Sequence, residues 1–299
     1  MTDFPVFAAT LLRHPRHRRT TVVAEFALPT GSFKDRGAAA VVADAARRGA
    51  RRVSLDSSGN SGLAVAAAAA QAGLDSVIRV TIGIAPAKEA LIRAIGARLE
   101  KFATRAEAAR ACAEDPGSYD ASHIRNPIFR RGVSTLAAAW QAKQELPRTI
   151  YLPVGSGSLL LGLWEGLRQL RASGTLEYLP RLVAVQSERC APIARPADPG
   201  DGKTIADGCA LLAPPAAREI RAAIEESGGR AVVVTENEIG RAWRHAWQTG
   251  LPIEPTSALA FAALDRDSAE SDEPSAVIAT GSGLKAPPPE GAVDRRPSS

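Results

Sequence analysis

Short runs of β-branched residues alternate along the chain with longer stretches that are rich in alanine and leucine and have a helical period. This alternation indicates an α/β fold, and uninterrupted apolar runs are typical of parallel strands that helices cover on both faces. We predict strands at Val22–Phe26, Arg52–Leu55, Val77–Ile82, Thr149–Val154, Arg181–Gln186, Ala231–Thr235 and Ala276–Ala279. We predict helices at Gly37–Arg48, Ser61–Ala72, Pro86–Ile95, Thr104–Ala113, Val133–Leu146, Leu159–Arg171, Pro215–Glu226, Glu236–Gln248 and Ser257–Leu264.

Glycines and capping residues mark several of the predicted helix ends. Gly73 and Gly96 each follow a helical stretch, at the place where a left-handed residue commonly ends a helix. Thr235 and Glu238 have the spacing of a capping box. No repeat or linker divides the chain, so any two lobes must be interwoven. Residues 286–299 are proline-rich and charged, and we expect them to be disordered.

The composition is that of a soluble globular protein with a small excess of positive charge. The chain has 299 residues, with 37 Lys and Arg against 32 Asp and Glu. The basic run at 14–19 has no recognition motif beside it, so we predict a solvated segment and no nucleic-acid contact. Three scattered cysteines indicate neither a disulfide scaffold nor a metal site. The apolar run Gly62–Gly73 is too short to span a membrane, and without a signal peptide we expect a cytoplasmic protein.

Four loops rich in glycine, serine, threonine and asparagine follow predicted strands, where open α/β sheets bind their ligands. The first is Pro29–Gly37, which holds Lys34 between glycines ahead of a helix. Burial in a pocket would lower the pKa of this amine and make it a nucleophile toward an aldehyde. The alternative is a surface lysine near a helix start.

The second loop, Asp56–Gly62, leads into a helix, and its hydroxyls and backbone N–H groups can form an anion site. The carboxylate of an amino acid would fit there, and the amide of Asn60 could bond a ring hydroxyl. The alternative is a plain N-cap turn.

The third loop, Val154–Leu159, joins a strand to a helix, and its glycines let the backbone close around a phosphate. A dinucleotide-binding turn competes with this interpretation because a later strand ends near Glu188. However, Leu160 stands where that motif has its third glycine. The fourth loop, Thr280–Lys285, follows the last strand, and a hydroxyl there could face a pyridine nitrogen.

Together and in this order, the four loops resemble those of fold-type II pyridoxal-phosphate enzymes, in the tryptophan synthase beta-like superfamily. The strings PTGSFKDRG, SSGNSG, VGSGS and TGSGLK are closest to the threonine synthases, beside threonine dehydratases and cysteine synthases. The resemblance runs from about Val22 to Lys285. It implies pyridoxal 5′-phosphate as the cofactor, two interleaved α/β lobes with parallel sheets covered by helices, and the homodimer that is usual in this family.

The resemblance also implies a role for each loop. Lys34 would form the Schiff base with the cofactor and then move protons at the substrate's α-carbon. Asn60 would contact the ring oxygen, and Thr280 the ring nitrogen. The residues that would hold the 5′-phosphate are Gly155, Ser156, Gly157 and Ser158. Those that would hold the substrate's carboxylate are Ser57, Ser58, Gly59 and Ser61.

The architecture of that family divides the chain into two lobes. The larger, 1–44 plus 132–285, would contain Lys34, the phosphate loop and Thr280. The smaller, 45–131, would carry the Asn60 loop. Closure of the smaller lobe on the substrate's carboxylate would exclude water from the reaction.

Two segments differ from the threonine synthase pattern. The N-terminal segment lacks the usual Gly-Glu-Gly-x-Thr-Pro-Leu string. The segment around Asn126, which usually supplies an arginine for the substrate's phosphate, is also changed. It holds His123, Ile124 and Phe129 at those places, with Arg130 and Arg131 shifted nearby. Each lost charge-assisted contact is worth roughly 1.5–3 kcal/mol, which argues against O-phosphohomoserine as the substrate.

These observations favour a threonine synthase-like lyase or synthase that performs β- or γ-elimination or replacement on a small amino acid, with or without a small nucleophile. A neutral hydroxyl at the ring nitrogen makes the ring a weaker electron sink, which favours these reactions over transamination. The alternatives are a serine/threonine dehydratase, a cysteine synthase-like β-replacement enzyme, and a catalytically silent cofactor-binding homologue.

Overall fold

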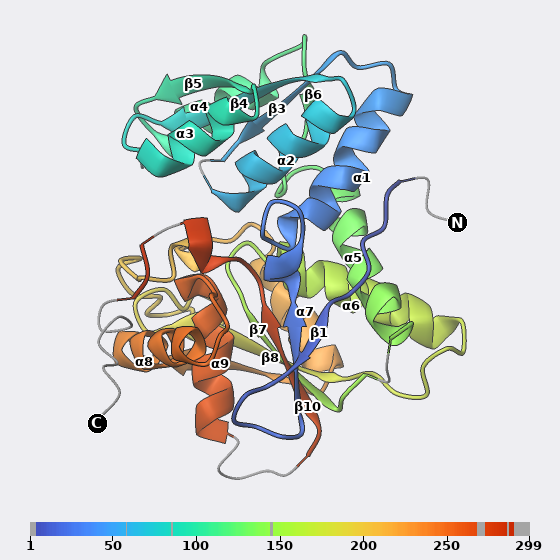
Figure 1. The fold of residues 1–299 in the computed structure, drawn as a ribbon, viewed down its shortest axis with the longest axis vertical. Helices are drawn as coiled ribbons and strands as arrows, with labels where there is room; N and C mark the ends of the chain where they lie inside the picture. Colours follow the sequence, from blue (N-terminus) through green and yellow to red (C-terminus); the bar gives the residue numbers. More distant parts are fainter. Residues whose placement is uncertain are drawn as a thin grey trace.

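The computed structural model describes residues 4–57, 59–84, 86–143, 146–267, 273–285 and 287–289. Two mainly parallel sheets organise these residues, one in each half of the molecule along its long axis (Figure 1). Helices cover both sheets, which confirms the fold class predicted from the sequence. The expected disordered tail lies outside the described residues except for 287–289, and the lobe boundaries remain a prediction.

The large sheet has the strand order β1-β2-β10-β7-β8-β9. Its strands are β1 (Leu11–Arg13), β2 (Thr20–Ala24), β7 (Thr149–Pro153), β8 (Arg181–Ser187), β9 (Arg230–Val234) and β10 (Ser275–Ala279). The last strand, β10, lies between β2 and β7, so strands from the beginning and the end of the sequence lie side by side within the sheet. Every residue of β7 and β10 is buried, as cover by helices on both faces requires.

The small sheet is parallel throughout and has the order β5-β4-β3-β6. Its strands are β3 (Arg52–Asp56), β4 (Asp75–Thr81), β5 (Arg98–Phe102) and β6 (Tyr119–Asp120). The helices beside it are α2 (Asn60–Gln71), α3 (Pro86–Ala94) and α4 (Arg105–Ala113). We call this sheet and these helices the small lobe, and the large sheet with its helices the large lobe (Figure 1).

Close helix packing fixes the start of α1 relative to the large lobe. The remaining helices are α1 (Lys34–Arg47), α5 (Pro127–Gln141), α6 (Ser158–Ala172), α7 (Ala217–Glu226), α8 (Glu236–Gln248) and α9 (Pro255–Asp267). A Cβ atom at Gly132 of α5 would lie 2.3 Å from the Arg36 carbonyl of α1. A Cβ atom at Gly166 of α6 would lie 2.2 Å from the Ser134 carbonyl of α5. The three helices therefore pack backbone against backbone, and Lys34 is the first residue of that stack.

All of the predicted helices and strands are present among the described residues, with shifted ends. Gly73 and Gly96 have positive φ, and Thr235 forms the predicted capping box. The predicted start of α5 at Val133 was wrong, because Asn126 caps the helix by accepting from Ile128 N and Pro127 begins it.

Three of the described strands were not predicted from the sequence: β1, β5 and β6. In β5 the sequence Arg-Leu-Glu-Lys-Phe is mostly polar, because this strand lies at the edge of the small sheet with partly exposed residues. Strand β1 is also an edge strand, and β6 has two residues. Short or charged edge strands do not show the apolar run that marks a buried strand.

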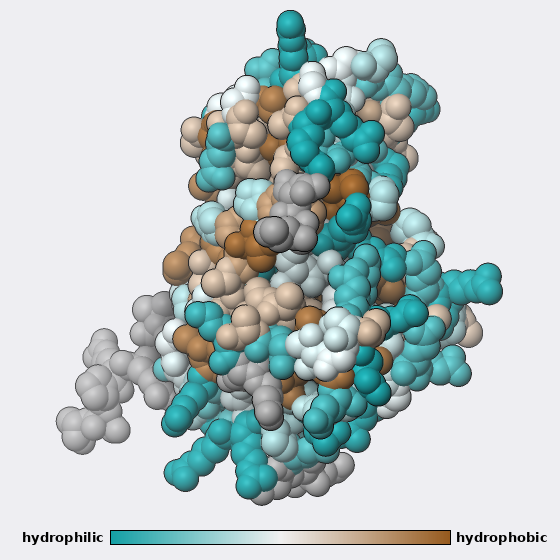
Figure 2. Space-filling model, turned by 90° about the vertical axis from the view of Figure 1, so that its right-hand side faces the viewer, coloured by the Kyte–Doolittle hydropathy of each residue, from teal (hydrophilic) through white to brown (hydrophobic). Residues whose placement is uncertain are grey.

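The surface is mostly hydrophilic on the face that Figure 2 shows, with smaller hydrophobic groups near the middle of the long axis. None of the helices in the described ranges is long and apolar enough to cross a membrane. Within the same ranges, no group of three or more His, Cys, Asp or Glu side chains could hold a metal ion.

Candidate functional site

The first, third and fourth loops meet at the carboxyl edge of the large sheet. The parallel register pairs Ala279 with Ala24, so the segments that follow β10 and β2 leave the sheet side by side. They are joined by a bridge between Ser32 and Gly281, and Phe33 N donates to the Thr280 carbonyl at 3.0 Å. The site is therefore built where the topology brings the segments after β2 and β10 together.

The lysine loop is closed by its own side chains. Gly31 has a φ of 75°, which only glycine adopts readily, and turns the chain toward α1. Asp35 accepts hydrogen bonds from the Thr30 backbone at 2.8 Å and from the Thr30 hydroxyl at 2.5 Å. Arg36 forms a buried ion pair with Glu25 at 2.6 Å. These contacts give Thr30, Asp35 and Arg36 structural roles in the lysine loop. The Lys34 side chain takes no part in them and instead contacts Ser158.

The Lys34 amine lies in the interior between the two lobes. Its Nζ donates to Ser158 Oγ at 3.0 Å and lies 4.6 Å from the centre of the Phe33 ring. Burial lowers the pKa of this amine to about 8, against the opposite effect of the nearby Cys209 and Glu254. The amine is therefore partly shielded from water and in contact with Ser158, which favours the interpretation as a pocket lysine over that of an exposed surface lysine.

The phosphate loop predicted between β7 and α6 is a backbone turn packed too tightly for side chains at its glycines. Gly157 is the N-cap of α6 with a φ of 87°, and a Cβ atom there would lie 2.6 Å from Ile220. A Cβ atom at Gly155 would lie 2.9 Å from the Cα atom of Cys209. The hydroxyls of Ser156 and Ser158 lie 3.4 Å apart at the start of the helix. The loop thus presents backbone N–H groups at a positive helix end, which is an anion-binding geometry.

Asn60 and Thr280 lie on opposite lobes and bond the same carboxylate. Asn60 Nδ2 donates to Glu254 Oε2 at 2.9 Å, and Thr280 Oγ1 donates to Glu254 Oε1 at 3.4 Å. Lys285 Nζ donates to Asn60 Oδ1 at 2.5 Å and to the carbonyls of Thr30 and Gly31. Burial raises the pKa of Glu254, while Lys285 opposes that effect.

Glu254 and Lys285 are site residues that sequence reasoning did not select. Both lie in segments that showed family agreement, Lys285 at the end of TGSGLK and Glu254 at the start of EPTSA. A charged side chain in each of these segments was the available signal. Their contact with Asn60 depends on the packing of the lobes and is not visible in the sequence.

The second loop leads into α2 at the carboxyl end of β3. Gly59 is the extended N-cap, and its N–H donates to Ser57 Oγ at 3.3 Å. Ser61 is buried in the first turn of α2. Ser58 lies outside the described residues. The loop lies at a helix N-terminus, and the binding of a substrate's carboxylate there stays a prediction.

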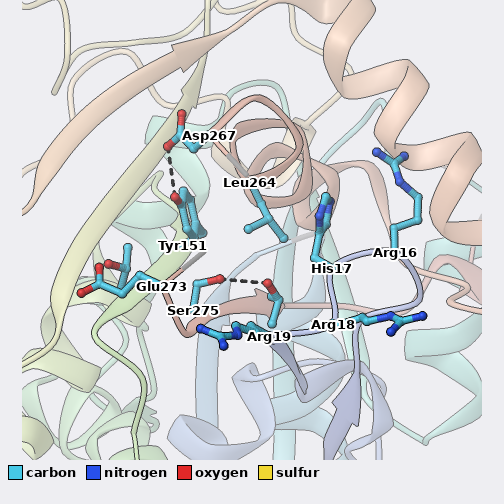
Figure 3. A pocket seen from close by; sticks show the side chains of 11 residues that line it. Arg16, His17, Arg18, Arg19, Tyr151, Leu264, Asp267, Glu273 and Ser275 are labelled. Carbon is cyan, nitrogen blue, oxygen red and sulfur yellow. Dashed lines mark hydrogen bonds between the residues drawn. The ribbon is translucent and has the colours of Figure 1, made fainter. Parts of the chain in front are cut away.

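A cavity of about 220 Å³ lies at the other, amino end of the large sheet. It is lined by the first residues of β2, β7 and β10 and by the basic run 16–19. Arg16 pairs with Asp265 at 3.2 Å, and the Tyr151 hydroxyl donates to Asp267 at 3.1 Å. In Figure 3 the guanidinium ends of Arg16 and Arg18 point away from the Tyr151 ring. This cavity is thus separated by the length of the sheet from the loops that hold Lys34.

Comparison with known protein families and curated proteins gives consistent matches. Residues 5–283 match the family described as pyridoxal-phosphate dependent enzyme. The chain is 32% identical over 272 residues to the threonine synthase of Mycobacterium leprae, covering 87% of this chain and 75% of that protein. It is 31% identical over 278 residues to the threonine synthase of Methanosarcina acetivorans, covering 87% and 69%.

Solved structures of related fold are also similar. A pyridoxal 5′-phosphate-dependent aspartate racemase has a TM-score of 0.79 at 21% identity, covering 93% of this chain and 91% of that one. A threonine deaminase has a TM-score of 0.76 at 25% identity, covering 90% and 89%. The aspartate racemase match shows the fold alone.

Proposed function

This chain belongs to the pyridoxal-phosphate dependent enzyme family, as a relative of the threonine synthases, and from that premise we propose the roles of its site residues. It is a pyridoxal-phosphate-dependent lyase of threonine synthase-like type. We propose that Lys34 carries the cofactor for β- or γ-elimination or replacement on a small amino acid. The observation that carries this proposal is the partly buried Lys34 amine, 3.0 Å from Ser158 Oγ at the start of α6.

Three features of the described residues fit this cofactor. The lowered pKa of Lys34 leaves part of its amine uncharged near neutral pH, as condensation with an aldehyde requires. The backbone of residues 155–158 would hold the 5′-phosphate at the N-terminus of α6. Asn60 and Thr280 share the Glu254 carboxylate, and we propose that they bond the ring oxygen and ring nitrogen once that carboxylate moves aside.

When bound, pyridoxal 5′-phosphate supplies an aldehyde for the substrate's amine and an electron-withdrawing ring for its α-carbon. We propose that Lys34 Nζ moves the proton of that carbon, while Ser158 Oγ accepts a hydrogen bond from the same amine. The Thr280 hydroxyl is a neutral partner that does not force a ring nitrogen to be protonated. This supports elimination or replacement over reactions that need a long-lived carbanion.

The carboxylate of the substrate would bind at the N-terminus of α2. The residues proposed for this role are Ser57, Ser58, Gly59 and Ser61. Contacts between the lobes include Asn60 to Glu254 and Lys88 to Asp207, each at 2.9 Å, and Lys285 to Asn60 at 2.5 Å. Tightening of these contacts around a bound substrate would exclude water from the reacting carbon.

Two further proposals concern the cellular compartment and the oligomeric state of the protein. Cys112, Cys190 and Cys209 are buried and unpaired, which supports a reducing compartment such as the cytoplasm. The homodimer that is usual among the enzymes this sequence resembles stays a prediction, as does a small nucleophile for replacement chemistry.

A serine/threonine dehydratase or a cysteine synthase-like β-replacement enzyme is the second candidate. Arg130, beside the place where an arginine for the substrate's phosphate is expected, instead pairs with Glu219 at 2.6 Å. Arg131 is exposed on α5. These positions support a substrate without a phosphate group, and the similarity to a threonine deaminase agrees with that interpretation.

Absorbance spectroscopy tests the proposal directly. The purified protein with added pyridoxal 5′-phosphate is expected to show a visible band, and Lys34→Ala is expected to abolish it, since the band requires the amine. A matched control is Lys203→Met, which removes an exposed amine and should keep the band. Product release from L-serine, L-threonine, O-acetylserine and O-phosphohomoserine then separates the candidate reactions. A wild-type protein that stays colourless would overturn the role of Lys34.

A further inference from the structure

His123 lies in the loop between β6 and α5, next to the loop proposed for the substrate's carboxylate. Strand β6 pairs in parallel with β3, with Tyr119 opposite Val53, so the carboxyl ends of the two strands lie at the same edge. Arg125 bonds Asp56 at 3.0 Å and Asp120 at 3.0 Å and thereby ties the two loops together. The segment that contains His123 therefore lies beside the loop that leads into α2.

The imidazole of His123 has a buried nitrogen without a hydrogen-bond partner among the described residues. Nδ1 is buried, and no described residue lies within hydrogen-bonding distance of it. The side chain as a whole keeps partial exposure, and its ring centre lies 6.0 Å from that of Phe129, edge to face. The Phe129 ring centre is in turn 5.8 Å from Lys34 Nζ. A buried polar atom without a partner costs free energy, which a ligand that bonds it would recover.

The imidazole of His123 offers a ligand no positive charge of its own. Burial lowers the pKa of His123 well below its ordinary value, and the charges of Lys34, Arg125 and Arg105 lower it further, so the ring is uncharged at neutral pH. Arg125 is already paired with two carboxylates. Arg105, the weakest of these influences, is exposed to solvent.

Phe129 argues against a phosphate group on the ligand. Its side chain is fully buried and packs against Gly37, the residue one helical turn after Lys34. An aromatic ring at this place offers no donor to a phosphate, and the next residue, Arg130, is turned toward Glu219. A phosphate dianion brought here would lose its hydration without gaining a cation, which is costly in a buried site.

Building on the proposed function, we propose that His123 and Phe129 receive the substrate's side chain and select an amino acid with an uncharged leaving group, which His123 binds by a hydrogen bond from its imidazole. The substrate class is then serine, threonine or a similar β-hydroxy amino acid. In the elimination Lys34 takes the α-proton, the C–H electron pair forms the Cα–Cβ double bond, and the Cβ–O bond breaks with its pair on oxygen. The proton held by Lys34 returns to that oxygen to give water, and His123 keeps its own proton.

Steady-state kinetics and binding on the holoenzyme test this specificity role. Wild type, His123→Ala, His123→Asn and the control Arg131→Ala, an exposed residue of the same segment, are compared with L-serine, O-phospho-L-serine and β-chloro-L-alanine. Binding is read from the change in the visible band, so preference is measured even when turnover is slow. The unchanged band of each variant without substrate shows that cofactor binding and folding are intact.

We expect His123→Ala to lower kcat/KM for L-serine by about tenfold, the effect of one lost hydrogen bond. The loss should be much smaller with β-chloro-L-alanine, whose chloride leaves without a hydrogen bond, and His123→Asn should recover part of the activity on L-serine. Equal losses on all substrates, or none, would show that His123 does not contact the leaving group. A wild-type enzyme that binds O-phospho-L-serine as well as L-serine would also overturn the inference. In both cases an intact band would leave the role of Lys34 standing.

Discussion

The side-chain amide of Asn60 in the small lobe donates a hydrogen bond to the Glu254 carboxylate of the large lobe at 2.9 Å. The two residues are 194 positions apart in the chain. Lys285 holds the other end of the same amide at 2.5 Å, and because an ammonium can only donate, it fixes the amide oxygen toward itself. The nitrogen of Asn60 is thereby aimed into the site, where a ring oxygen would accept from it.

The first prediction concerns Lys285. Lys285→Met removes the donor shared by Asn60 and the carbonyls of Thr30 and Gly31, so the amide loses its fixed orientation. Leaving such groups without a donor costs about 1–3 kcal/mol, and we expect the dissociation constant for pyridoxal 5′-phosphate to rise by roughly tenfold or more. Fluorescence titration of the cofactor-free protein measures it. Unchanged affinity, equal to that of Lys203→Met, would contradict the positioning role.

The second prediction concerns the charge of Lys34 in the cofactor-free protein. Its pKa is lowered from 10.5 to about 8, so between these values the unfolded state binds more protons than the folded state, and stability rises with pH. Below pH 8 the buried charge costs on the order of 3 kcal/mol. Lys34→Met should therefore be more stable than wild type at pH 7 by up to this amount.

Urea denaturation at several pH values measures this difference. The advantage of Lys34→Met should shrink as the pH rises from 8 through 10.5, above which the wild-type amine is mostly neutral in both states. Lys203→Met, at an exposed position, should show no such trend. A Lys34→Met protein that is less stable than wild type at pH 7 would mean that the charge is well solvated in the folded state.

The third prediction concerns the packing of α1 on Phe129. A Cβ atom at Gly37 would lie 2.2 Å from the Phe129 ring, so Gly37→Ala must push the ring away and should cost about 1–3 kcal/mol. Gly240→Ala is the matched control, because no atom lies within 4 Å of its Cβ position in α8, and it should gain about 0.5–1 kcal/mol. Denaturant titration compares the two. Equal changes in stability for the two substitutions would show that the Phe129 ring moves aside without a cost in free energy.

The sequence alone determined the local features of the site. Asp35 bonds Thr30 five residues away, and Gly31 and Gly157 have positive φ, so these features depend on local backbone geometry and can be read without a fold, as can the apolar runs of the buried strands. The predicted helices were found with errors at their ends, the largest at α5, which begins at Pro127 and not at Val133. The family of the chain followed from these strings because each needs its own residue types at fixed spacing.

Only the tertiary structure decided which distant side chains meet. Lys34 and Ser158 are 124 residues apart, and their 3.0 Å contact exists because the parallel sheet brings the ends of β2 and β7 to one edge through β10. The contacts of Glu254 and Lys285 with Asn60, and the unpartnered nitrogen of His123 near Phe129, depend in the same way on how the two lobes pack. A sequence pattern encodes backbone geometry over a few residues, while the distance between separate segments is set by the packing of the whole chain.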